Sequence, residues 1–571
     1  MDLTLPQTRL GPRRYNAAVS EHSSSLPISV LSVFLFCACT NGVKTAKEPA
    51  AAADSSIDSG VPQQDSGDSP QDSGSPPEQE AHPSLGPIQS CDAPMAAPAW
   101  RERGVELGLP DRPDDGRLAS ETYLAVDDLD GDGDLDVIAS VFGHAEPGQP
   151  VEPVTLYWWT GERFETEALT DVEIAWAPTL ADMDGDGDMD ILTPGHGDWL
   201  RNDGGDFWPV PWAGIPEERL IHVREFEAYD LNGDGHLDLF GLSTHQDSDP
   251  VLGSDIFLWG NADGSFVEAE GVIPPLDPPG SGFDSFWIDW FGDGQPEMFV
   301  ANDRGAMHAP NALLQWNGER FEDIAPSLGL DLAHDAMGAD AGDFNRDGVP
   351  DLYITATNNN VLMLSQPDGV HADVATALNA DPVQGTLSEL AMGWGGLFVD
   401  HDNDGHLDLF TTQGDWWYQP EDRVPFPLQL LRFDGSQFVD VSAETGLTAE
   451  GSFRGAISRD FNGDGILDFL VSSVFGHAKL FMSDGCTQNT WLSVTAPQSA
   501  RIQVSAGDTV WTDWAKANSS FGGHARPFAH FGLGDLEVVD RIEVVLPGGE
   551  VFEIDGPIGT RRHVQIPPVS P

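Results

Sequence analysis

Positive charge is scarce in this chain of 571 residues. It has 27 Lys and Arg against 94 Asp and Glu, which gives a formal net charge of -67. A surface of that sign repels a phosphate backbone, which excludes nucleic-acid binding, and it disfavours docking to anionic membranes through basic patches. So many carboxylates need a counter-charge, and metal ions are the first candidates for it.

Long apolar runs and cysteines are also few. The apolar run at residues 26–36 is too short to cross a bilayer as a helix. Arginines precede it and small residues follow it, so residues 1–39 are predicted to be a secretory signal. The segment ends in Cys-Ala-Cys, which resembles a bacterial lipobox and predicts lipidation of Cys39. Ordinary cleavage near Ala38 is the alternative.

Aromatic residues are absent from residues 40–90, although the whole chain has 17 Trp and 29 Phe. This segment repeats Asp-Ser-Gly and cannot bury enough apolar area to become ordered, so it is predicted to be a flexible tether. After a lipidated Cys39 it would hold a folded body away from a membrane. A plain disordered spacer would look the same. Beyond the tether, 62 Gly and 43 Pro favour an all-β fold with many turns.

An acidic nine-residue pattern, Asp-x-Asp/Asn-x-Asp-Gly-x-x-Asp, recurs seven times. We call the seven segments loops 1 to 7; they are residues 128–136, 182–190, 230–238, 289–297, 343–351, 400–408 and 460–468. Their starts are 54, 48, 59, 54, 57 and 60 residues apart, a period typical of a solenoid or propeller.

The pattern fits the coordination chemistry of calcium, which takes six to eight oxygens at about 2.3–2.6 Å. Side chains at positions 1, 3, 5 and 9 and the backbone carbonyl at position 7 can supply them, and glycine at position 6 permits the turn. The expected ligand residues are Asp128, Asp130, Asp132, Asp134 and Asp136 in loop 1; Asp182, Asp184, Asp186, Asp188 and Asp190 in loop 2; Asp230, Asn232, Asp234, His236 and Asp238 in loop 3; Asp289, Asp293 and Glu297 in loop 4; Asp343, Asn345, Asp347, Val349 and Asp351 in loop 5; Asp400, Asp402, Asp404, His406 and Asp408 in loop 6; and Asp460, Asn462, Asp464, Ile466 and Asp468 in loop 7.

Loop 4 is degenerate because Phe291 stands at position 3, so about six strong calcium sites and a weaker seventh are expected. The alternative is that the aspartates only cap turns. Three or four carboxylates held within a few ångströms repel one another unless a cation lies among them, which favours calcium. An EF-hand is excluded because short β-rich runs, instead of helices, flank each loop.

Two further strands can be assigned in each repeat, which makes each loop a turn within a four-stranded unit. Four strands repeated seven times predict a seven-bladed β-propeller over residues 91–486, and residues 487–571 follow the last repeat. Cys91 and Cys486 bracket the repeats, whose first and last members are neighbours in a ring. An exported chain permits a Cys91–Cys486 disulfide, and two free thiols are the alternative.

The loops resemble those of FG-GAP and VCBS-type propeller repeats, and loops 5 and 6 with their Met-Gly and Trp-Gly lead-ins are similar to cartilage acidic protein relatives. The segments Asn489–Val494, His530–Gly534 and Val539–Val544 resemble the ASPIC/UnbV-type domain in which those relatives end. The resemblance implies a calcium-loop propeller followed by a small β-sandwich-like domain, secreted or surface-anchored, with no established chemistry.

These features predict a calcium-stabilised binding or adhesion protein without catalytic activity. It would be a lipoprotein of the bacterial cell surface or outer membrane, or a secreted protein, and its ligand would be an unknown protein or carbohydrate. A propeller-based polysaccharide lyase or hydrolase is one alternative, and a structural matrix component is another. A cluster of Asp, Lys or His at the mouth of the central channel would favour the enzyme. An exposed aromatic patch, for which Trp416, Trp417 and Tyr418 are candidates, would favour binding, and buried packing of these residues between blades is the alternative.

Overall fold

The computed structural model describes residues 82–110, 120–143, 154–169, 176–194, 198–243, 254–274, 280–303, 307–357, 359–381, 392–415, 425–474 and 478–567. The chain divides into Met1–Pro77 and a compact unit, Glu78–Pro571, to which all described residues belong. Cys39, the signal segment, most of the tether and the aromatic residues 416–418 lie outside the described residues.

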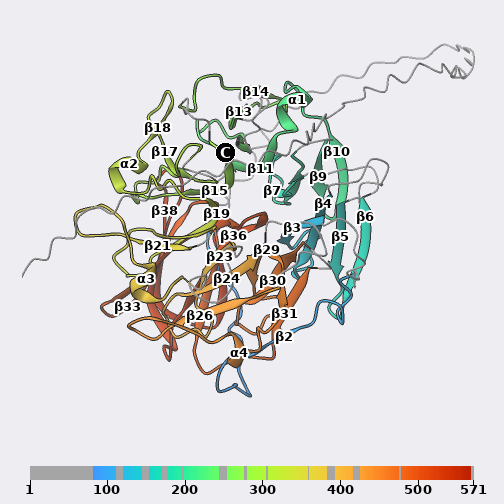
Figure 1. Cartoon of the computed structure of the whole chain (residues 1–571). Helices are drawn as coiled ribbons and strands as arrows, with labels where there is room; N and C mark the ends of the chain where they lie inside the picture. Colours follow the sequence, from blue (N-terminus) through green and yellow to red (C-terminus); the bar gives the residue numbers. More distant parts are fainter. Residues whose placement is uncertain are drawn as a thin grey trace, which may run out of the picture. The chain divides into compact units, whose positions relative to one another are not determined.

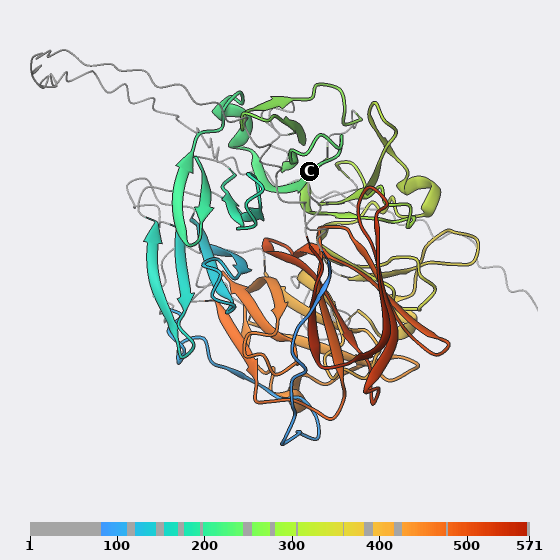
Figure 2. The same cartoon turned by 180° about the vertical axis from the view of Figure 1, so that it is seen from behind.

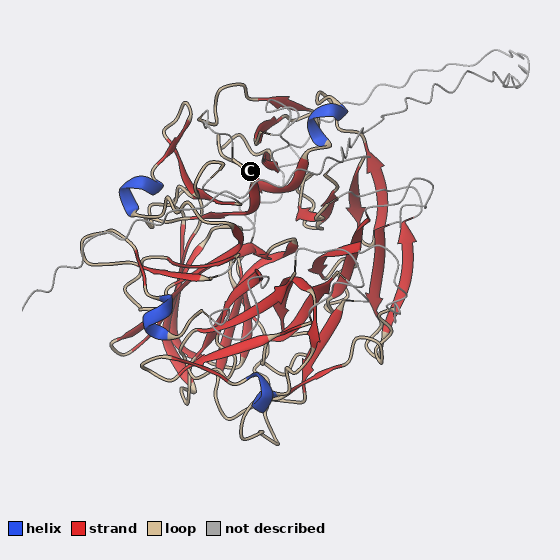
Figure 3. Cartoon of the chain, in the orientation of Figure 1, coloured by secondary structure: helices blue, strands red, loops and turns tan. Residues whose placement is uncertain are grey.

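Strands dominate the compact unit, and the described helices are four-residue turns (Figure 3). They are α1 (Glu217–Leu220), α2 (Ala325–Leu328), α3 (Ala375–Leu378) and α4 (Ser442–Thr445). Within the described part of the chain, no helix has the length and apolar character that a membrane span requires.

Four antiparallel strands recur as a set through the repeats, and the strand pairings give seven such sets among the described residues. The sets are β3 (Ser120–Asp127), β4 (Asp136–Gly143), β5 (Val154–Trp159) and β6 (Phe164–Leu169); β7 (Thr179–Ala181), β8 (Asp190–Leu192), β9 (Trp199–Asp203) and β10 (Asp206–Val210); β11 (Val223–Tyr229), β12 (Asp238–Ser243), β13 (Ile256–Gly260) and β14 (Phe266–Glu268); β15 (Gly282–Ile288), β16 (Glu297–Asn302), β17 (Ala312–Trp316) and β18 (Phe321–Asp323); β19 (Ala336–Gly342), β20 (Asp351–Ala356), β21 (Val361–Leu364) and β22 (Ala372–Asp373); β23 (Met392–Val399), β24 (Asp408–Gly414), β26 (Gln429–Phe433) and β27 (Phe438–Asp440); and β29 (Phe453–Arg459), β30 (Asp468–Ser473), β31 (Lys479–Ser483) and β2 (Trp100–Glu102).

The first strands of these sets, β3, β7, β11, β15, β19, β23 and β29, line the middle of the unit (Figure 1). The hydrophobic core lies between neighbouring sets, as where Phe240 and Leu242 of β12 pack with Met298 and Val300 of β16. Neighbouring sets cover both faces of β12 and β16, so these two strands are buried along their whole length. The middle of each strand is therefore apolar. The all-β propeller fold is confirmed, and the count of seven blades remains our interpretation of these pairings.

The seventh set differs from the prediction because its outer strand comes from the N-terminal side of the repeats. Trp100 of β2 pairs with Ser483 of β31, although the two are far apart in sequence. Close by, Cys91 and Cys486 form a disulfide with a Cα–Cα distance of 5.9 Å. A strand and a covalent bond thus join the two ends of the repeat region.

The C-terminal residues form a β-sandwich. One sheet contains β33 (Arg501–Ala506), β34 (Thr509–Trp514), β37 (Val538–Val545) and β38 (Val551–Gly559); the other contains β1 (Ser84–Leu85), β32 (Trp491–Thr495), β35 (Lys516–Ser520), β36 (Gly523–Gly532) and β39 (Arg562–Gln565). Val494, Val504 and Phe531 belong to the core between them. The predicted tether ends earlier than residue 90, since Ser84 and Leu85 pair with Gln565 and Val564. A short pair, β25 (Phe426–Pro427) with β28 (Glu450–Gly451), completes the described strands.

The C-terminal domain is not a separate appendage. Its β35–β36 hairpin enters the middle of the repeat unit, where Gly523–Ala525 of β36 pair in parallel with β3 and β36 also contacts β7. Figure 1 shows β36 among the labels of the first strands, and Figure 2 shows the dark red C-terminal strands from the other side. No pattern in the sequence predicted this insertion, which occupies the channel that a propeller would otherwise leave open.

Candidate metal centre

Each acidic loop joins the first and second strands of its set, so the loops recur at equivalent ends of successive sheets. Their aspartates are held by backbone N–H groups of the same loop. In loop 1, Gly133 N–H donates to Asp128 Oδ2 at 3.0 Å, and Asp134 N–H donates to Asp132 Oδ1 at 2.9 Å. Equivalent bonds, from position 6 to position 1 and from position 7 to position 5, occur in all seven loops at 2.7–3.0 Å.

The acid at position 9 is fixed from two directions. In loop 1, Asp136 accepts one hydrogen bond from Leu129 N–H at 3.1 Å and another from Trp159 N–H, on the third strand, at 2.8 Å. The other six loops repeat the first bond. All but loop 4 repeat the second, from a backbone N–H of the third strand or, in loop 5, from that of Ser365 directly after it. A carboxylate oxygen has two lone pairs, so these bonds orient each group and still leave acceptor capacity.

In loops 1, 2 and 6, the possible ligand atoms of three residues lie close together. Ligand oxygens of Asp128, Asp130 and Asp136 lie within 4.8 Å of one another, as do those of the equivalent residues of loop 2. In loop 6 two overlapping groups meet this limit, one formed by Asp400, Asp402 and Asp404 and one formed by His401, Asp402 and Asp408. Oxygens bound to one calcium at about 2.4 Å are at most about 4.8 Å apart, so these spacings fit one ion.

A buried carboxylate oxygen without a partner is a second feature that fits a bound cation. In loop 1, Asp128 Oδ1 is buried and has no hydrogen-bond partner. An unsatisfied buried carboxylate oxygen is costly unless a cation neutralises it. Loops 3, 5 and 7 have Asn232, Asn345 and Asn462 at position 3, where an amide oxygen replaces a carboxylate.

Loop 4 has the same backbone bonds but a poorer donor set. Phe291 at position 3 is 49% exposed and offers no oxygen. Glu297 at position 9 accepts bonds from Trp290 N–H at 3.1 Å and from the Gln315 side chain at 3.0 Å. The turn therefore persists without a full set of ligands, because its hydrogen bonds come from the backbone and do not depend on position 3.

Burial destabilises the charged forms of these acids. It raises the pKa of the position-9 residues Asp136, Asp190, Asp238 and Asp351 to about 7. Burial, with repulsion from Asp408 and Asp404 next, raises the pKa of Asp400 well above its ordinary value. These values describe the loops without an ion.

The C-terminal domain covers loops 4 to 6 more than loops 1 to 3. The position-1 residues Asp289, Asp343 and Asp400 are buried, whereas Asp128, Asp182 and Asp230 are half-buried. Trp514 Nε1–H donates to Asp289 O at 3.0 Å, and Trp511 Nε1–H donates to Gly405 O at 3.3 Å. The predicted ligands therefore fall into a covered and an open group, a division that the repeat pattern alone does not reveal.

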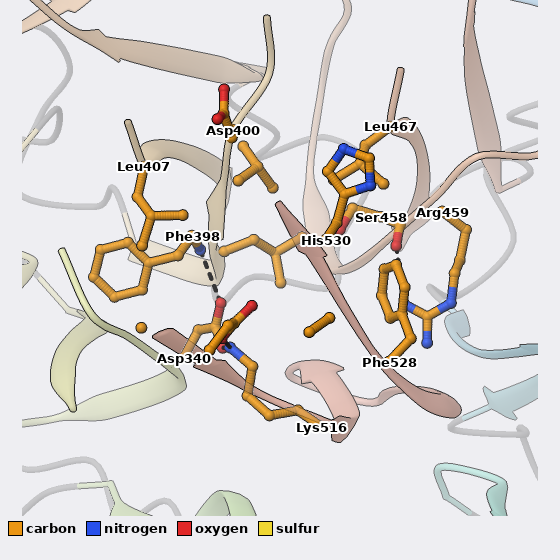
Figure 4. A pocket seen from close by; sticks show the side chains of 15 residues that line it. Asp340, Phe398, Asp400, Leu407, Ser458, Arg459, Leu467, Lys516, Phe528 and His530 are labelled. Carbon is orange, nitrogen blue, oxygen red and sulfur yellow. Dashed lines mark hydrogen bonds and ion pairs between the residues drawn. The ribbon is translucent and has the colours of Figure 1, made fainter. Parts of the chain in front are cut away.

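A pocket lies where the hairpin meets β19, β23 and β29 (Figure 4). Lys516 Nζ is 2.6 Å from Asp340 Oδ1, and Phe398 N–H donates to Asp340 Oδ2 at 2.8 Å. Arg459 Cζ lies 3.4 Å from the centre of the Phe528 ring. The pocket thus brings basic, acidic and aromatic side chains together where the C-terminal domain meets the repeats.

Comparisons with known proteins agree with this architecture. Residues 128–193, 230–300, 289–354 and 400–471 match the FG-GAP-like repeat, and residues 497–567 match the ASPIC and UnbV domain. The chain is therefore a protein of FG-GAP-like repeats with a C-terminal ASPIC/UnbV domain, as the resemblance in its sequence predicted.

Among particular proteins, the chain is distantly similar to cartilage acidic protein 1. The Mus musculus protein is 28% identical over 272 residues, 45% of this chain and 40% of that protein. The Xenopus tropicalis protein is 22% identical over 470 residues, 66% of this chain and 71% of that protein. The chain thus spans less than half of the mouse relative. Among solved structures, the Dos1 propeller has 10% identity and a TM-score of 0.38 over 62% of this chain and 76% of its own.

Proposed function

We propose that the protein is an exported binding protein whose acidic loops hold calcium ions. The observation that carries the proposal is the common construction of the loops, in which backbone N–H groups fix the carboxylates, together with the close approach of three ligand groups in each of loops 1, 2 and 6. Carboxylate, amide and carbonyl oxygens are the ligands that calcium prefers, whereas structural zinc sites use cysteine and histidine. Bound calcium would supply the positive charge that lets these carboxylates lie close together.

Export and binding are supported by other features. The Cys91–Cys486 disulfide suits an oxidising compartment, and the similarity to cartilage acidic protein 1 is consistent with an extracellular role. Because the hairpin occupies the channel, the ligand surface would lie on the outer faces or on the open loops 1 to 3. A protein or a carbohydrate is the expected ligand.

The proposal predicts ligand binding without turnover. Calcium-loaded protein applied to a glycan array and to an extracellular protein panel should retain a ligand, and chelation should release it because the loops lose their fixed form. A parallel screen of acidic polysaccharides should show no cleavage. Calcium-dependent cleavage of any of them would contradict the non-catalytic part of the proposal.

One observation favours the alternative function of a lyase or hydrolase. The pocket in Figure 4 is lined by acidic and basic side chains, those of Asp340, Asp513, Lys516 and His530. Two facts oppose it. The Lys516 and Asp340 side chains are only 13% and 7% exposed, and Lys516 Nζ is engaged by Asp340 and by Ala341 O. Were cleavage observed, Lys516→Met should abolish it without loss of bound calcium.

Anchoring at the cell surface through Cys39 is part of the proposal. Expressed in a bacterial host, the protein should incorporate labelled palmitate, and Cys39→Ser should abolish the incorporation because the thiol that would be lipidated is gone. Cys37→Ser, two residues earlier in the same segment, is the matched control and should incorporate label normally. Incorporation that survives Cys39→Ser would rule out this residue as the anchor.

A further inference from the structure

Loop 6 is in closer contact with the C-terminal domain than the open loops are. Asn489 Nδ2–H donates to Asp402 O at 2.8 Å, and Gly534 N–H donates to Asn403 O at 2.8 Å. His530 Nε2 lies 2.8 Å from Asn403 Oδ1. Three residues from two segments of the C-terminal domain thus bond to two consecutive residues of this loop, one of which is an expected calcium ligand.

The backbone of β36 also approaches the first ligand of loop 6. A Cβ atom added to Gly532 would lie 1.9 Å from Asp400 Oδ2 and 2.6 Å from Asn403 Cα. Only glycine allows the strand to pass there, and Asp400 is left 4% exposed. The shape that loop 6 has in this structure is therefore the shape against which β36 packs.

The same strand continues into the channel. Its N-terminal half pairs with β3, and the hairpin tip packs Phe521, 1% exposed, against Trp394 of β23 at a ring distance of 5.0 Å. Ser520 Oγ accepts a hydrogen bond from Gly396 N–H at 3.0 Å. Strand β23 ends at Val399, directly before loop 6. The hairpin therefore contacts the same blade at strand β23 and at loop 6.

We infer that loop 6 and the β35–β36 hairpin form one coupled unit, in which the ion in loop 6 holds the C-terminal domain docked and docking in turn retains the ion. The inference rests on the proposed calcium binding. Without an ion, the charged carboxylates of Asp400, Asp402, Asp404 and Asp408 repel one another, which opposes the backbone hydrogen bonds that shape the loop against β36. Coupling between two events is reciprocal, so undocking must weaken ion binding by the same factor.

Loop 3 provides the comparison, because it has the same construction but no hydrogen bond to the C-terminal domain among those described. Both loops have an exposed aspartate at position 5, Asp404 or Asp234, and a histidine at position 7. The aspartate accepts a hydrogen bond from the backbone N–H of that histidine, at 2.9 Å in loop 6 and at 3.0 Å in loop 3. Asp404→Ala and Asp234→Ala therefore remove the same backbone hydrogen bond, and the same expected ligand position, in a covered and an open loop.

The test measures bound calcium by elemental analysis and hydrogen exchange of Phe521–Phe531 in the full chain, in millimolar calcium. Both variants should lose about one ion. Only Asp404→Ala should speed exchange in the hairpin, by about 10- to 100-fold, because its docked state is less populated. Equal exchange in both variants, with one ion lost from each, would overturn the coupling and leave calcium binding intact. Loss of no ion from either variant would instead overturn the proposed calcium function together with the coupling.

A second variant tests the reverse direction and leaves every expected ligand side chain in place. Asn489→Ala removes the bond to Asp402 O from the C-terminal side. When a fluorescent chelator is mixed with the loaded protein, one slow phase of calcium release should become about 10-fold faster. The other phases serve as the internal control. Release that is unchanged in every phase would contradict the inference.

Discussion

Chelation of calcium is expected to lower the melting temperature of the protein by more than ten degrees. Ligands that bind only the folded state stabilise it, and one site with a dissociation constant of about 10 μM in about 1 mM calcium contributes roughly 2.7 kcal/mol. Several such sites rival the net stability of an ordinary domain, about 5–15 kcal/mol. Without ions, the loops would hold clustered carboxylates in a chain whose formal charge is already -67.

The metal and the number of sites can be tested in the same experiment. Magnesium should restore little of the lost stability, because it requires a smaller octahedral shell of oxygens. Calorimetric titration of the metal-free protein should count about six strong sites, since Phe291 leaves loop 4 without a donor at position 3. An unchanged melting temperature in chelator, with no calcium found by elemental analysis, would contradict the central claim.

The loops could be predicted from the sequence because everything they need is local. The side chains, the glycine turn and most of the backbone donors of a site lie within nine residues, and the pattern recurs at a steady period. The pairing of Cys91 with Cys486 followed from one further idea, that a ring brings its ends together. The loops thus need no distant contact, whereas the disulfide needs only the closure of the ring.

The hairpin could not be predicted in this way, since its partners are spread over several hundred residues. The segments that carry the ASPIC/UnbV resemblance also leave a gap between Val494 and His530, which contains β33 to β35 and most of β36. One signal was present in the glycines of the first strands. A Cβ atom on Gly455 would lie 1.9 Å from Phe521 O, and one on Gly395 would lie 3.0 Å from Ser520 Oγ. Glycine inside a strand often indicates the close approach of another backbone.

Short strands that pair through the backbone were missed for a different reason. Strand β1 has two residues, Ser84 and Leu85, within a segment whose composition is that of a tether. Strand β2 completes the seventh set from outside the repeats. Neither has an alternating apolar pattern long enough to indicate a strand, because their stability depends on a neighbour that is already formed.

Replacement of the residue at the tip of the hairpin should be the most damaging single substitution in the C-terminal domain. Phe521→Ala is expected to lower the free energy of unfolding by about 3–5 kcal/mol, the cost of emptying a well-packed aromatic site. The centre of the Phe521 ring lies 5.0–6.0 Å from the ring centres of Tyr123, Phe283 and Trp394. The cavity left by the substitution would therefore open where three blades meet. Because these residues belong to the repeats, the loss should appear in the melting of the repeat unit as well as in that of the C-terminal domain.

Urea unfolding in saturating calcium, followed by tryptophan fluorescence and by circular dichroism, measures the effect. Trp208→Ala is the control, because Trp208 is 55% exposed on β10 and its loss should change stability by less than about 0.5 kcal/mol. If the hairpin fills the channel, both probes should report one transition shifted to lower urea in Phe521→Ala. A cost no larger than that of Trp208→Ala would mean that the hairpin does not occupy the channel in solution, since a buried aromatic cannot be removed from a packed core without such a loss.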